Sequence, residues 1–402
     1  MQYLEHIKWI AQKQPEMLET LIKWAEINSG SQNLPGIRQM QTQIKKLYTN
    51  LNVTIHEYAI SPYEIINDQG QLIKQTVGDV LCLQQRPEAK YQILLCGHCD
   101  TVFDEHHPFQ QVTQLDDNTL QGPGVADMKG GLLVMYYALL ALEQSPYKDQ
   151  IGWQVFINAD EEIGSLSSSE LLPAMVENVD AAFVYEPAMD DTGTLAGTRK
   201  GTGNFTICVK GKSAHVGREF SDGRNAIVKL AELITQIHAL NQNHDMIVNV
   251  GKVLGGDALN RVPDFAMCKI NIRTTRMEDE KKFIDSLTNI INQSNQHDFK
   301  ITIHGKFHRK PKQLDAKTKQ LFSFVQAQAA QLELNLPIKA TGGCCDGNNL
   351  SALGIANVDT LGVRGGHIHT SDEYIKINSL VERAQLSALI LMAIASGELD
   401  LG

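Results

Sequence analysis

The chain has 402 residues, with 36 basic and 46 acidic side chains, a formal charge of −10 and seven cysteines. This length allows two or three domains with a sizeable core and excludes a small scaffold held together by disulfides. The acidic balance argues against binding to nucleic acid or an anionic membrane, so we expect neither partner. Residues 1–24 lack the uninterrupted apolar core of a signal peptide, and no stretch of 18 apolar residues follows, so we expect a cytoplasmic location. The basic triplet His308-Arg309-Lys310 is interpreted as a solvated loop.

Strands and helices alternate through the first half of the chain. Apolar residues at helical spacing predict helices over residues 15–25 and 37–51. Short apolar and β-branched runs predict strands at 53–60, 80–83, 93–96, 152–158 and 181–185, with a helix at 131–142 between the third and the fourth. Continuous apolar strands indicate an α/β fold with a mixed, largely parallel sheet flanked by helices.

Residues 200–308 have a different order of predicted strands and helices. The predicted order is strand 204–210, helix 224–240, strands 246–253 and 266–274, helix 278–293 and strand 300–304. This β-α-β-β-α-β order is the ferredoxin-like arrangement, which can fold alone. The alternation of helices and strands seen in the first half returns after this segment, with helix 316–332, loop 341–349, strand 356–361 and helix 379–396. We therefore predict one discontinuous α/β domain, 1–199 and 309–402, with 200–308 inserted as a lid.

Five segments of the α/β part place an acid or an imidazole at the end of a strand or in the loop after it, where open α/β sheets carry their sites. In the first segment, His98 and Asp100 face the same side, so Asp100 can orient the ring while His98 binds a metal. A surface histidine with a chance neighbour is the alternative. The second is the glycine-rich loop 122–131, which holds Asp127 but lacks the P-loop order and the dinucleotide fingerprint of a phosphate cradle.

The other three segments add carboxylates and histidines. Glu161 and Glu162 follow an apolar strand, although a solvated acidic loop would have the same sequence. Glu186 ends another apolar strand. A late glycine-rich loop contains two histidines that can face the same way, so spacing leaves open whether His367 or His369 is a ligand.

Together these side chains offer histidine nitrogens and carboxylate oxygens without thiolates, a set that suits zinc, manganese or cobalt. One carboxylate could bridge two divalent ions, each of which would also take one His and one Glu. The site would keep a net positive charge and lower the pKa of a bridging water from about 15.7 towards 7. A spare carboxylate beside a ligand would then take the proton of the water and pass it to a leaving amine.

Five motifs in this order resemble those of a known family: HCDTV, GPGVADMKGG, DEEIGS, YEP, and a late loop with GH followed by HTSDEY. The family comprises the co-catalytic dizinc metallopeptidases, among them glutamate carboxypeptidase, acetylornithine deacetylase, succinyl-diaminopimelate desuccinylase and aminoacylase. The resemblance covers nearly the whole chain, and the wording is most similar to glutamate carboxypeptidase. It implies a zinc-peptidase-like catalytic domain with the inserted ferredoxin-like lid.

Carried over to this sequence, the resemblance implies two Zn²⁺ per subunit, with Co²⁺ or Mn²⁺ as possible replacements. The implied roles are Asp127 as the bridge, His98 with Glu186 at one ion, Glu162 with His369 at the other, Glu161 as the base and Asp100 as the residue that orients His98. It also selects His369 over His367, because the family's ligand precedes a Glu by about four positions.

The resemblance also assigns roles outside the metal ligands. His215 would reach the active site of a partner subunit and stabilise the oxyanion, which implies a homodimer formed through the lid. Residues implied to contact the substrate are Asn260, Arg273, Arg199, Lys200, Gly343 and Asp346. Cys345 stands where the family has Ser or a small residue, and with Cys99 it leaves the substrate preference open.

The predicted function is hydrolysis of an amide bond, peptide or N-acyl, next to a free carboxylate. A metal-bridging hydroxide would attack a small or dipeptide-like substrate, with Glu161 as general base. The alternative within the class is an N-acyl-amino-acid deacylase, such as acetylornithine deacetylase or succinyl-diaminopimelate desuccinylase. A non-catalytic binding protein on the same fold is a further alternative.

Overall fold

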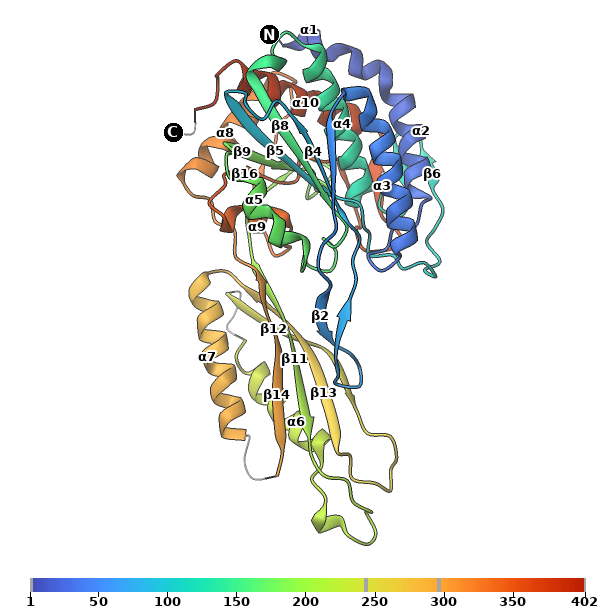
Figure 1. Ribbon diagram of the computed structural model, residues 1–402, viewed down its shortest axis with the longest axis vertical. Helices are drawn as coiled ribbons and strands as arrows, with labels where there is room; N and C mark the ends of the chain where they lie inside the picture. The colour runs from blue at the N-terminus through green and yellow to red at the C-terminus, as the bar shows by residue number, and fades with distance from the viewer. Residues whose placement is uncertain (1–2, 242–244, 295–297, 401–402) are drawn as a thin grey trace.

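The computed structural model describes residues 3–241, 245–294 and 298–400, which form two bodies joined end to end (Figure 1). A six-stranded sheet forms the centre of the first body. Its strands, in spatial order, are β1 (Thr54–Tyr58), β4 (Val80–Gln85), β8 (Ile151–Asn158), β5 (Tyr91–His98), β9 (Ala181–Val184) and β16 (Asn357–Val358). The last four run parallel, whereas β4 is antiparallel to both of its neighbours. The predicted mixed, largely parallel sheet is confirmed.

Alternate residues of these strands point to opposite faces of the sheet, and each face has its own core. On one face, Leu95 and Trp153 pack with the helices α2 (Gln14–Ala25), α3 (Leu34–Tyr48), α4 (Gly130–Gln144) and α10 (Asn378–Ala395). On the other face, Cys96 and Phe156 pack with residues of α5 (Leu172–Met175) and α9 (Asp346–Ala352). The sheet is therefore covered on both sides, which explains its continuous apolar strands.

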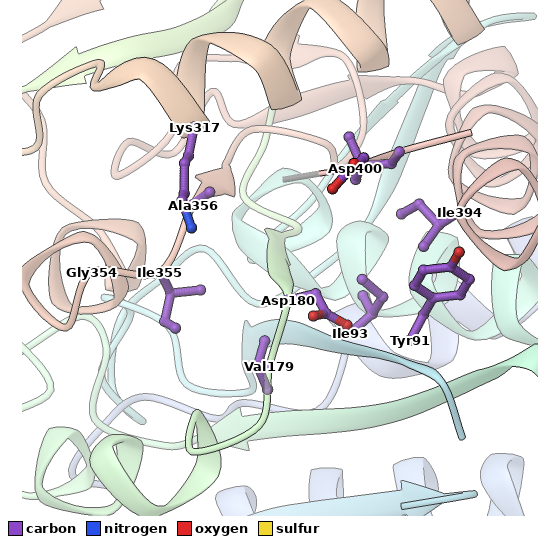
Figure 2. Close-up of a pocket in the computed structure, with 11 residues that line it drawn as sticks. Tyr91, Ile93, Val179, Asp180, Lys317, Gly354, Ile355, Ala356, Ile394 and Asp400 are labelled. Carbon is purple, nitrogen blue, oxygen red and sulfur yellow. The ribbon is translucent and has the colours of Figure 1, made fainter. Parts of the chain in front are cut away.

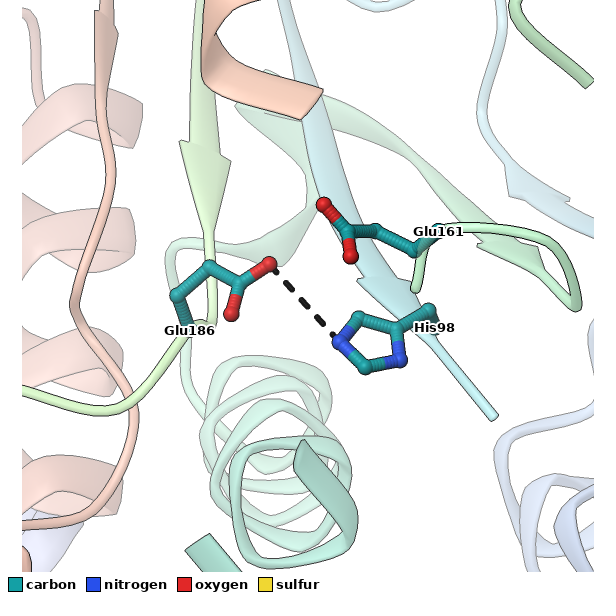
Figure 3. Close-up of side chains that lie close together, drawn as sticks. All are labelled: His98, Glu161 and Glu186. Carbon is teal, nitrogen blue, oxygen red and sulfur yellow. Dashed lines mark ion pairs between the residues drawn. The ribbon is translucent and has the colours of Figure 1, made fainter. Parts of the chain in front are cut away.

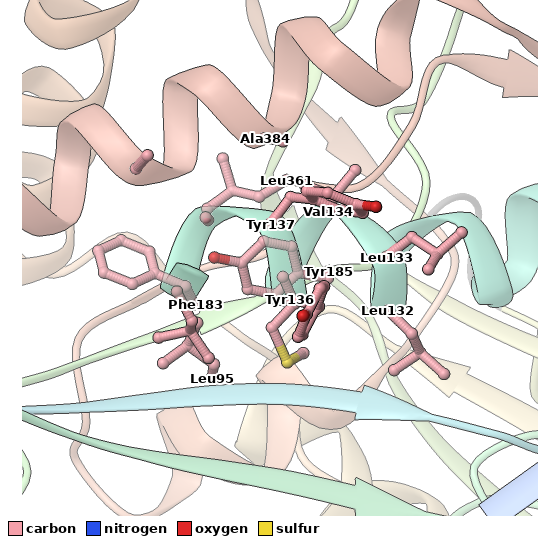
Figure 4. Packing of buried hydrophobic residues seen from close by; sticks show 14 of the residues in the cluster. Leu95, Leu132, Leu133, Val134, Tyr136, Tyr137, Phe183, Tyr185, Leu361 and Ala384 are labelled. Carbon is pink, nitrogen blue, oxygen red and sulfur yellow. The ribbon is translucent and has the colours of Figure 1, made fainter. Parts of the chain in front are cut away.

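Helix α4 lies at the centre of the larger core, where its residues pack against β9, Leu361 and α10 (Figure 4). Among the described residues, one helical stretch, Val125–Gln144, is long and apolar enough to cross a membrane by length and composition. Its apolar window is 94% buried inside the protein. Burial on all sides accounts for this composition.

The second body has the predicted β-α-β-β-α-β order. Its elements are β11 (Gly201–Lys210), α6 (Ala226–His238), β12 (Met246–Gly255), β13 (Phe265–Thr274), α7 (Met277–Ser294) and β14 (Lys300–Arg309). The antiparallel sheet has the order β12-β13-β11-β14, and α6 and α7 share a core with one of its faces. The limits of the two domains stay a prediction.

Three parts of the first body differ from the prediction. The hairpin of β2 (Tyr63–Ile66) and β3 (Leu72–Gln75) was not predicted, and it extends towards the second body (Figure 1). The segment 341–349 is not a loop throughout, because α9 begins at Asp346 with Cys345 as its N-cap. Two further small sheets form: β10 (Leu195–Arg199) pairs with β15 (Ile338–Thr341), and a four-stranded sheet has the order β17 (Gly365–Gly366), β18 (Tyr374–Lys376), β7 (Thr119–Gln121), β6 (Thr113–Asp116).

Candidate metal centre

The candidate site lies where three neighbouring parallel strands end. His98 is the last residue of β5, Glu161 and Glu162 follow β8, and Glu186 follows β9. The strands are aligned so that His98 stands opposite Asn158 of β8, which brings these loops to the same edge of the sheet. Sequence placed each residue at a strand end, and the parallel register brings those ends together.

A fifth residue, Asp127, reaches the site from the glycine-rich loop before α4. The carboxylate of Glu373 accepts hydrogen bonds from the backbone N–H groups of Gly124 (3.1 Å), Ala126 (2.9 Å) and Asp127 (3.0 Å). Gly124 has φ +70°, a conformation that a residue with a side chain rarely adopts. Glu373 therefore fixes the backbone that presents Asp127, a role that local sequence gave no means to assign.

Asp127 stands between two histidines. Its Oδ1 lies 3.1 Å from His98 Nε2, and its Oδ2 lies 3.2 Å from His369 Nε2. Each imidazole also contacts a second carboxylate: His98 Nε2 is 3.7 Å from Glu186 Oε1, and His369 Nε2 is 3.1 Å from Glu162 Oε2. Asp127 is thus common to two His–Glu pairs, while the assignment of these residues as metal ligands stays a prediction.

Potential metal donors form two groups, and within each group the donor atoms all lie within 4.8 Å of one another. One group is His98, Glu161 and Glu186, and the other is His98, Asp127 and Glu162. Figure 3 shows Glu161 and Glu186 on the same side of the His98 ring. His367, the alternative left open by spacing, makes an edge contact with the Tyr374 ring at 5.5 Å between centroids.

The electrostatics of the cluster favour a cation. Burial raises the pKa of Glu161 to about 7 and, together with the charge of Asp127, that of Glu162 to about 8. Hydrogen bonds to Asp127 and Glu162 raise the pKa of His369 to about 11. Burial opposes protonation of His98, yet hydrogen bonds to Asp100 and Asp127 outweigh it and raise its pKa well above the ordinary value. The raised pKa values of the two imidazoles reflect the negative charge of the surrounding carboxylates, which bound divalent cations would neutralise.

Asp100 connects the His98 ring to the loop after β8. Its Oδ1 lies 3.4 Å from His98 Nδ1, and its backbone oxygen lies 3.0 Å from the same nitrogen. The carboxylate also accepts hydrogen bonds from the N–H groups of Glu161 (3.3 Å) and Glu162 (3.2 Å) and from the Ser31 hydroxyl (2.7 Å). One buried carboxylate thus orients both the ring and the acidic loop.

Arg309 is a residue of the site that sequence reasoning missed. The solvated loop predicted at 308–310 is wrong for His308 and Arg309, which belong to β14; His308 is half-buried, and Arg309, the last residue of the strand, is 5% exposed. Its Nη2 donates to the Glu161 carbonyl (3.0 Å) and to Ser165 Oγ (2.9 Å) and lies 2.7 Å from Glu161 Oε1. The contact between Arg309 Nη2 and Glu161 Oε1 does not have hydrogen-bond geometry, and Oε1 has no hydrogen-bond partner among the described atoms. A buried carboxylate oxygen without a donor fits a site built for a cation.

A cleft of about 1420 Å³ opens on the cluster. It is lined by one face of the second sheet, the β2–β3 hairpin, the loop at 341–345 and the metal-centre residues Asp127, Glu161, Glu162, Glu186 and His369. Three of the predicted substrate contacts, Arg199, Arg273 and Gly343, are among the lining residues. Arg273 is half-buried and donates to Asn271 Oδ1 (2.9 Å) and Cys344 Sγ (3.0 Å). Its guanidinium is thus held in the cleft by neutral partners.

The other residues predicted around this loop make contacts within the protein. Arg199 borders the cleft, but its guanidinium donates twice to Asp359 (both 2.9 Å) and once to the Gly343 carbonyl. Asp346 is buried and accepts from Asn158 and from the Ser165 hydroxyl. These contacts show how the loop is held in place, while contact with a substrate stays a prediction.

The Lys200 carbonyl likewise accepts from Cys344 Sγ at 2.9 Å and Asn348 Nδ2 at 3.0 Å.

His215 and Asn260 lie together but away from the metal centre. The Val216 N–H donates to the Asn260 carbonyl, and His215 pairs with Arg261 in an isolated bridge. The loop between β11 and α6, which contains His215, is at the end of the second body farthest from the first (Figure 1). Neither residue is among the described residues that line the cleft.

A second pocket lies at the opposite end of the sheet (Figure 2). It has about 370 Å³ and includes Tyr91, the first residue of β5, and Asp180, which precedes β9. Its charged lining residues are Asp180, Lys317 and Asp400, and the described lining contains neither histidine nor cysteine. Among the described residues, both groups of potential metal donors lie at the first site.

Comparisons with known proteins agree with this geometry. Residues 94–393 match the profile of peptidase family M20/M25/M40. Carboxypeptidase G2 of Pseudomonas sp. (strain RS-16) is 23% identical over 96% of this chain and 91% of its own length. Succinyl-diaminopimelate desuccinylase of Buchnera aphidicola subsp. Acyrthosiphon pisum (strain Tuc7) is 26% identical over 72% of this chain and 80% of its own.

Solved structures share the fold. A tripeptidase from Staphylococcus aureus subsp. aureus mu50 gives a TM-score of 0.74 at 23% identity, covering 95% of this chain and 99% of its own. An M20 family metallo-carboxypeptidase from Sulfolobus solfataricus gives 0.73 at 17% identity, covering 94% and 99%. Since the matched residues include every member of the His and carboxylate cluster, the chain belongs to peptidase family M20/M25/M40 and is a metallopeptidase or amidohydrolase of that family.

Proposed function

We propose that this enzyme hydrolyses an amide bond next to a free carboxylate, in the manner of a glutamate carboxypeptidase. The observation that carries the proposal is the juxtaposition of the His and carboxylate cluster with the half-buried Arg273 in one cleft. Planar guanidinium groups bind carboxylates through two parallel hydrogen bonds, so Arg273 is suited to hold the free carboxylate of a dipeptide-like substrate.

The cluster would hold two Zn²⁺ ions per subunit, or Co²⁺ or Mn²⁺ in their place. His98 and Glu186 would bind one ion, Glu162 and His369 the other, and Asp127 both, in keeping with the contacts of Asp127 to the two imidazoles. When bound, the ions would supply Lewis acidity that activates water and polarises the amide carbonyl.

Glu161 is the proposed general base. It is buried, borders the cleft, and has a pKa raised to about 7 by burial despite the opposing charge of Arg309. A carboxylate with a pKa near the working pH can take a proton from the attacking water and return it to the leaving amine. The Arg309 and Asp100 contacts keep the Glu161 backbone in place during both transfers.

The second candidate is an N-acyl-amino-acid deacylase. It is favoured by the desuccinylase relatives, which match about as well in identity as the carboxypeptidase but over a smaller share of the chain. The chemistry at the metal centre is the same in both cases, because each reaction cleaves an amide beside a carboxylate. The two reactions differ in which part of the substrate, on one or the other side of the scissile amide bond, the pocket binds.

We also propose that the active form is a homodimer made through the second body. His215 and Asn260 lie in loops that carry the exposed apolar residues Val216, Phe220 and Leu259. Exposed apolar side chains gathered in this way are typical of an interaction surface. A second copy bound there would bring His215 towards the partner's cleft, where it could stabilise the oxyanion.

The test is a substrate panel assayed with and without metal. C-terminal glutamyl dipeptides and N-acyl amino acids are compared at equal zinc, after chelation, and after restoration with zinc, cobalt or manganese. Hydrolysis should disappear on chelation and return with metal. The Glu161→Gln variant should bind as much metal as the wild type and lose about 10²- to 10⁴-fold in kcat. Hydrolysis that is indifferent to chelators would refute the metal-dependent reaction, and a metal-loaded wild type inactive on the whole panel would favour a binding protein.

A further inference from the structure

The β2–β3 hairpin, which lies between β1 and β4 in the chain, forms a two-stranded sheet of its own. Its turn is preformed: Asn67 Oδ1 accepts from the N–H groups of Gln69 (3.0 Å) and Gln71 (2.9 Å), and Gly70 takes φ +73°. Hydrogen bonds within an Asx turn hold the tip in one conformation. The hairpin is therefore an ordered projection from the first body.

The tip of the hairpin docks on the second body. Ile66 is buried in a small core of its own with Cys208 and Met267, and Leu254 and Phe265 pack around it. Cys208 and Met267 are paired residues of β11 and β13, on the face turned away from α6 and α7. The hairpin thus covers part of the sheet face that borders the cleft.

Two further contacts fix the position of the tip. A side chain at Gly70 would meet the Phe265 ring at 2.4 Å, so the backbone itself lies against the ring. Asp68 lies 2.6 Å from Lys252 Nζ and 3.4 Å from Lys269 Nζ. Both lysines belong to the second sheet. Because the ion pairs are about half exposed, they position the tip of the hairpin more than they strengthen its docking.

The base of the hairpin is tied to the first body. Gln75 donates to Gln32, which donates in turn to the Tyr63 hydroxyl at 3.4 Å. The hairpin therefore spans the cleft from one body to the other.

The cleft ends where the hairpin docks. Thr202, Asn204 and Thr206, alternate residues of β11, line the cleft, whereas Cys208, the next in the series, is covered by Ile66 and is 3% exposed. Cys208 is seven residues beyond Gly201, or roughly 23 Å along the strand at about 3.3 Å per residue. The space between the metal centre and Ile66 is thus bounded.

We propose that the β2–β3 hairpin is an end wall of the substrate cleft, and that its docking through Ile66 restricts the enzyme to short substrates. The inference rests on the proposed hydrolase function and adds its substrate class: amides beside a carboxylate with a small group on the far side of the scissile bond. Longer acyl or peptidyl groups would have to displace the hairpin from Cys208 and Met267.

The experiment compares two isoleucines of the same hairpin. Ile66→Ser removes the docked side chain, whereas Ile73→Ser makes the same chemical change at a residue that is 39% exposed and outside the docked core. Docking is measured by the rate at which Cys208 reacts with a maleimide, located by peptide mass mapping. Cys344, which is half-buried in the cleft, gives an internal reference in the same protein. We expect at least a tenfold faster reaction of Cys208 in Ile66→Ser and no change in Ile73→Ser.

Selectivity is measured with N-acyl glutamates of increasing acyl length, in the metal-loaded enzyme. The ratio of kcat/KM for the longest over the shortest substrate should rise at least tenfold in Ile66→Ser and stay unchanged in Ile73→Ser. Equal ratios in all three proteins, or a Cys208 that reacts as fast as Cys344 in the wild type, would overturn the proposal. A wild type that hydrolyses no member would overturn the proposed function instead, while the maleimide rates would still decide whether the hairpin docks.

Discussion

Asp359→Asn tests how the junction between the two bodies is held. Asp359 is fully buried and accepts from Arg199 (2.9 Å, twice) and from Lys312 Nζ (2.8 Å). Arg199 and Lys312 pair in a bridge where the chain leaves the first body and where it returns. One carboxylate therefore neutralises a cation on each of the two connecting segments.

The expected loss of stability depends on the hydrogen bonds that Arg199 and Lys312 keep in the variant. Removing one partner of a buried ion pair costs about 3–5 kcal/mol, because the remaining charge is left uncompensated. Lys312 keeps hydrogen bonds to Asn357 Oδ1 (2.7 Å) and the Asn357 carbonyl (3.1 Å), and Arg199 keeps one to the Gly343 carbonyl. We therefore expect a total loss of about 3–5 kcal/mol in the free energy of unfolding rather than twice that amount.

The assay is urea unfolding at pH 7, with Asp298→Asn as a matched control. Asp298 pairs with Arg224 at the surface, where both side chains are partly exposed, so its loss should cost at most about 1 kcal/mol.

The dependence on pH has a defined sign. Burial would raise the pKa of Asp359, but the charges of Arg199 and Lys312 outweigh it and lower the pKa below the ordinary value. The contribution is therefore complete above the unfolded pKa of about 3.9 and lost as the pH falls through the folded pKa. The difference between wild type and variant should be constant from pH 6 to pH 8, at about the value measured at pH 7. Equal losses for the two Asn variants, or a difference that grows on acidification, would refute this account.

Three further predictions concern the metal centre. Glu373→Gln should weaken metal binding about 10- to 100-fold in a chelator competition titration, because the Asp127 loop loses a charged hydrogen-bond acceptor. An unchanged metal affinity would mean that the loop keeps its conformation without Glu373. His369→Ala should lower the metal bound per subunit in elemental analysis while His367→Ala leaves it unchanged; the reverse result would exchange their roles. Gly131→Ala should lower the melting temperature, with a cost of about 1–3 kcal/mol, because the new Cβ would lie 2.0 Å from a carbonyl oxygen. Gly342→Ala, with no atom within 4 Å, is its control, and equal melting temperatures would contradict the packing argument.

Sequence patterns were enough to predict which classes of element form and which side chains are candidate ligands. Apolar periodicity predicted the strands of the first sheet and the β-α-β-β-α-β order of the second body, because burial on one or two faces imposes a repeat that can be counted. Motif wording indicated a candidate set of metal ligands, with His369 preferred over His367, and that set stays a prediction. The contacts of His369 with Asp127 and Glu162 agree with that choice.

Tertiary structure decided the contacts that carry no local signal. Arg309 is adjacent in sequence to two other basic residues, yet the end of β14 turns it inward against Glu161. Both strands of the β2–β3 hairpin carry apolar residues, yet Ile66 is its one buried isoleucine, and it is covered by the second body rather than by its own sheet. Both features depend on residues more than a hundred positions away in the chain. A periodicity shows that a side chain will be buried, but only the packing of distant segments determines which partner buries it.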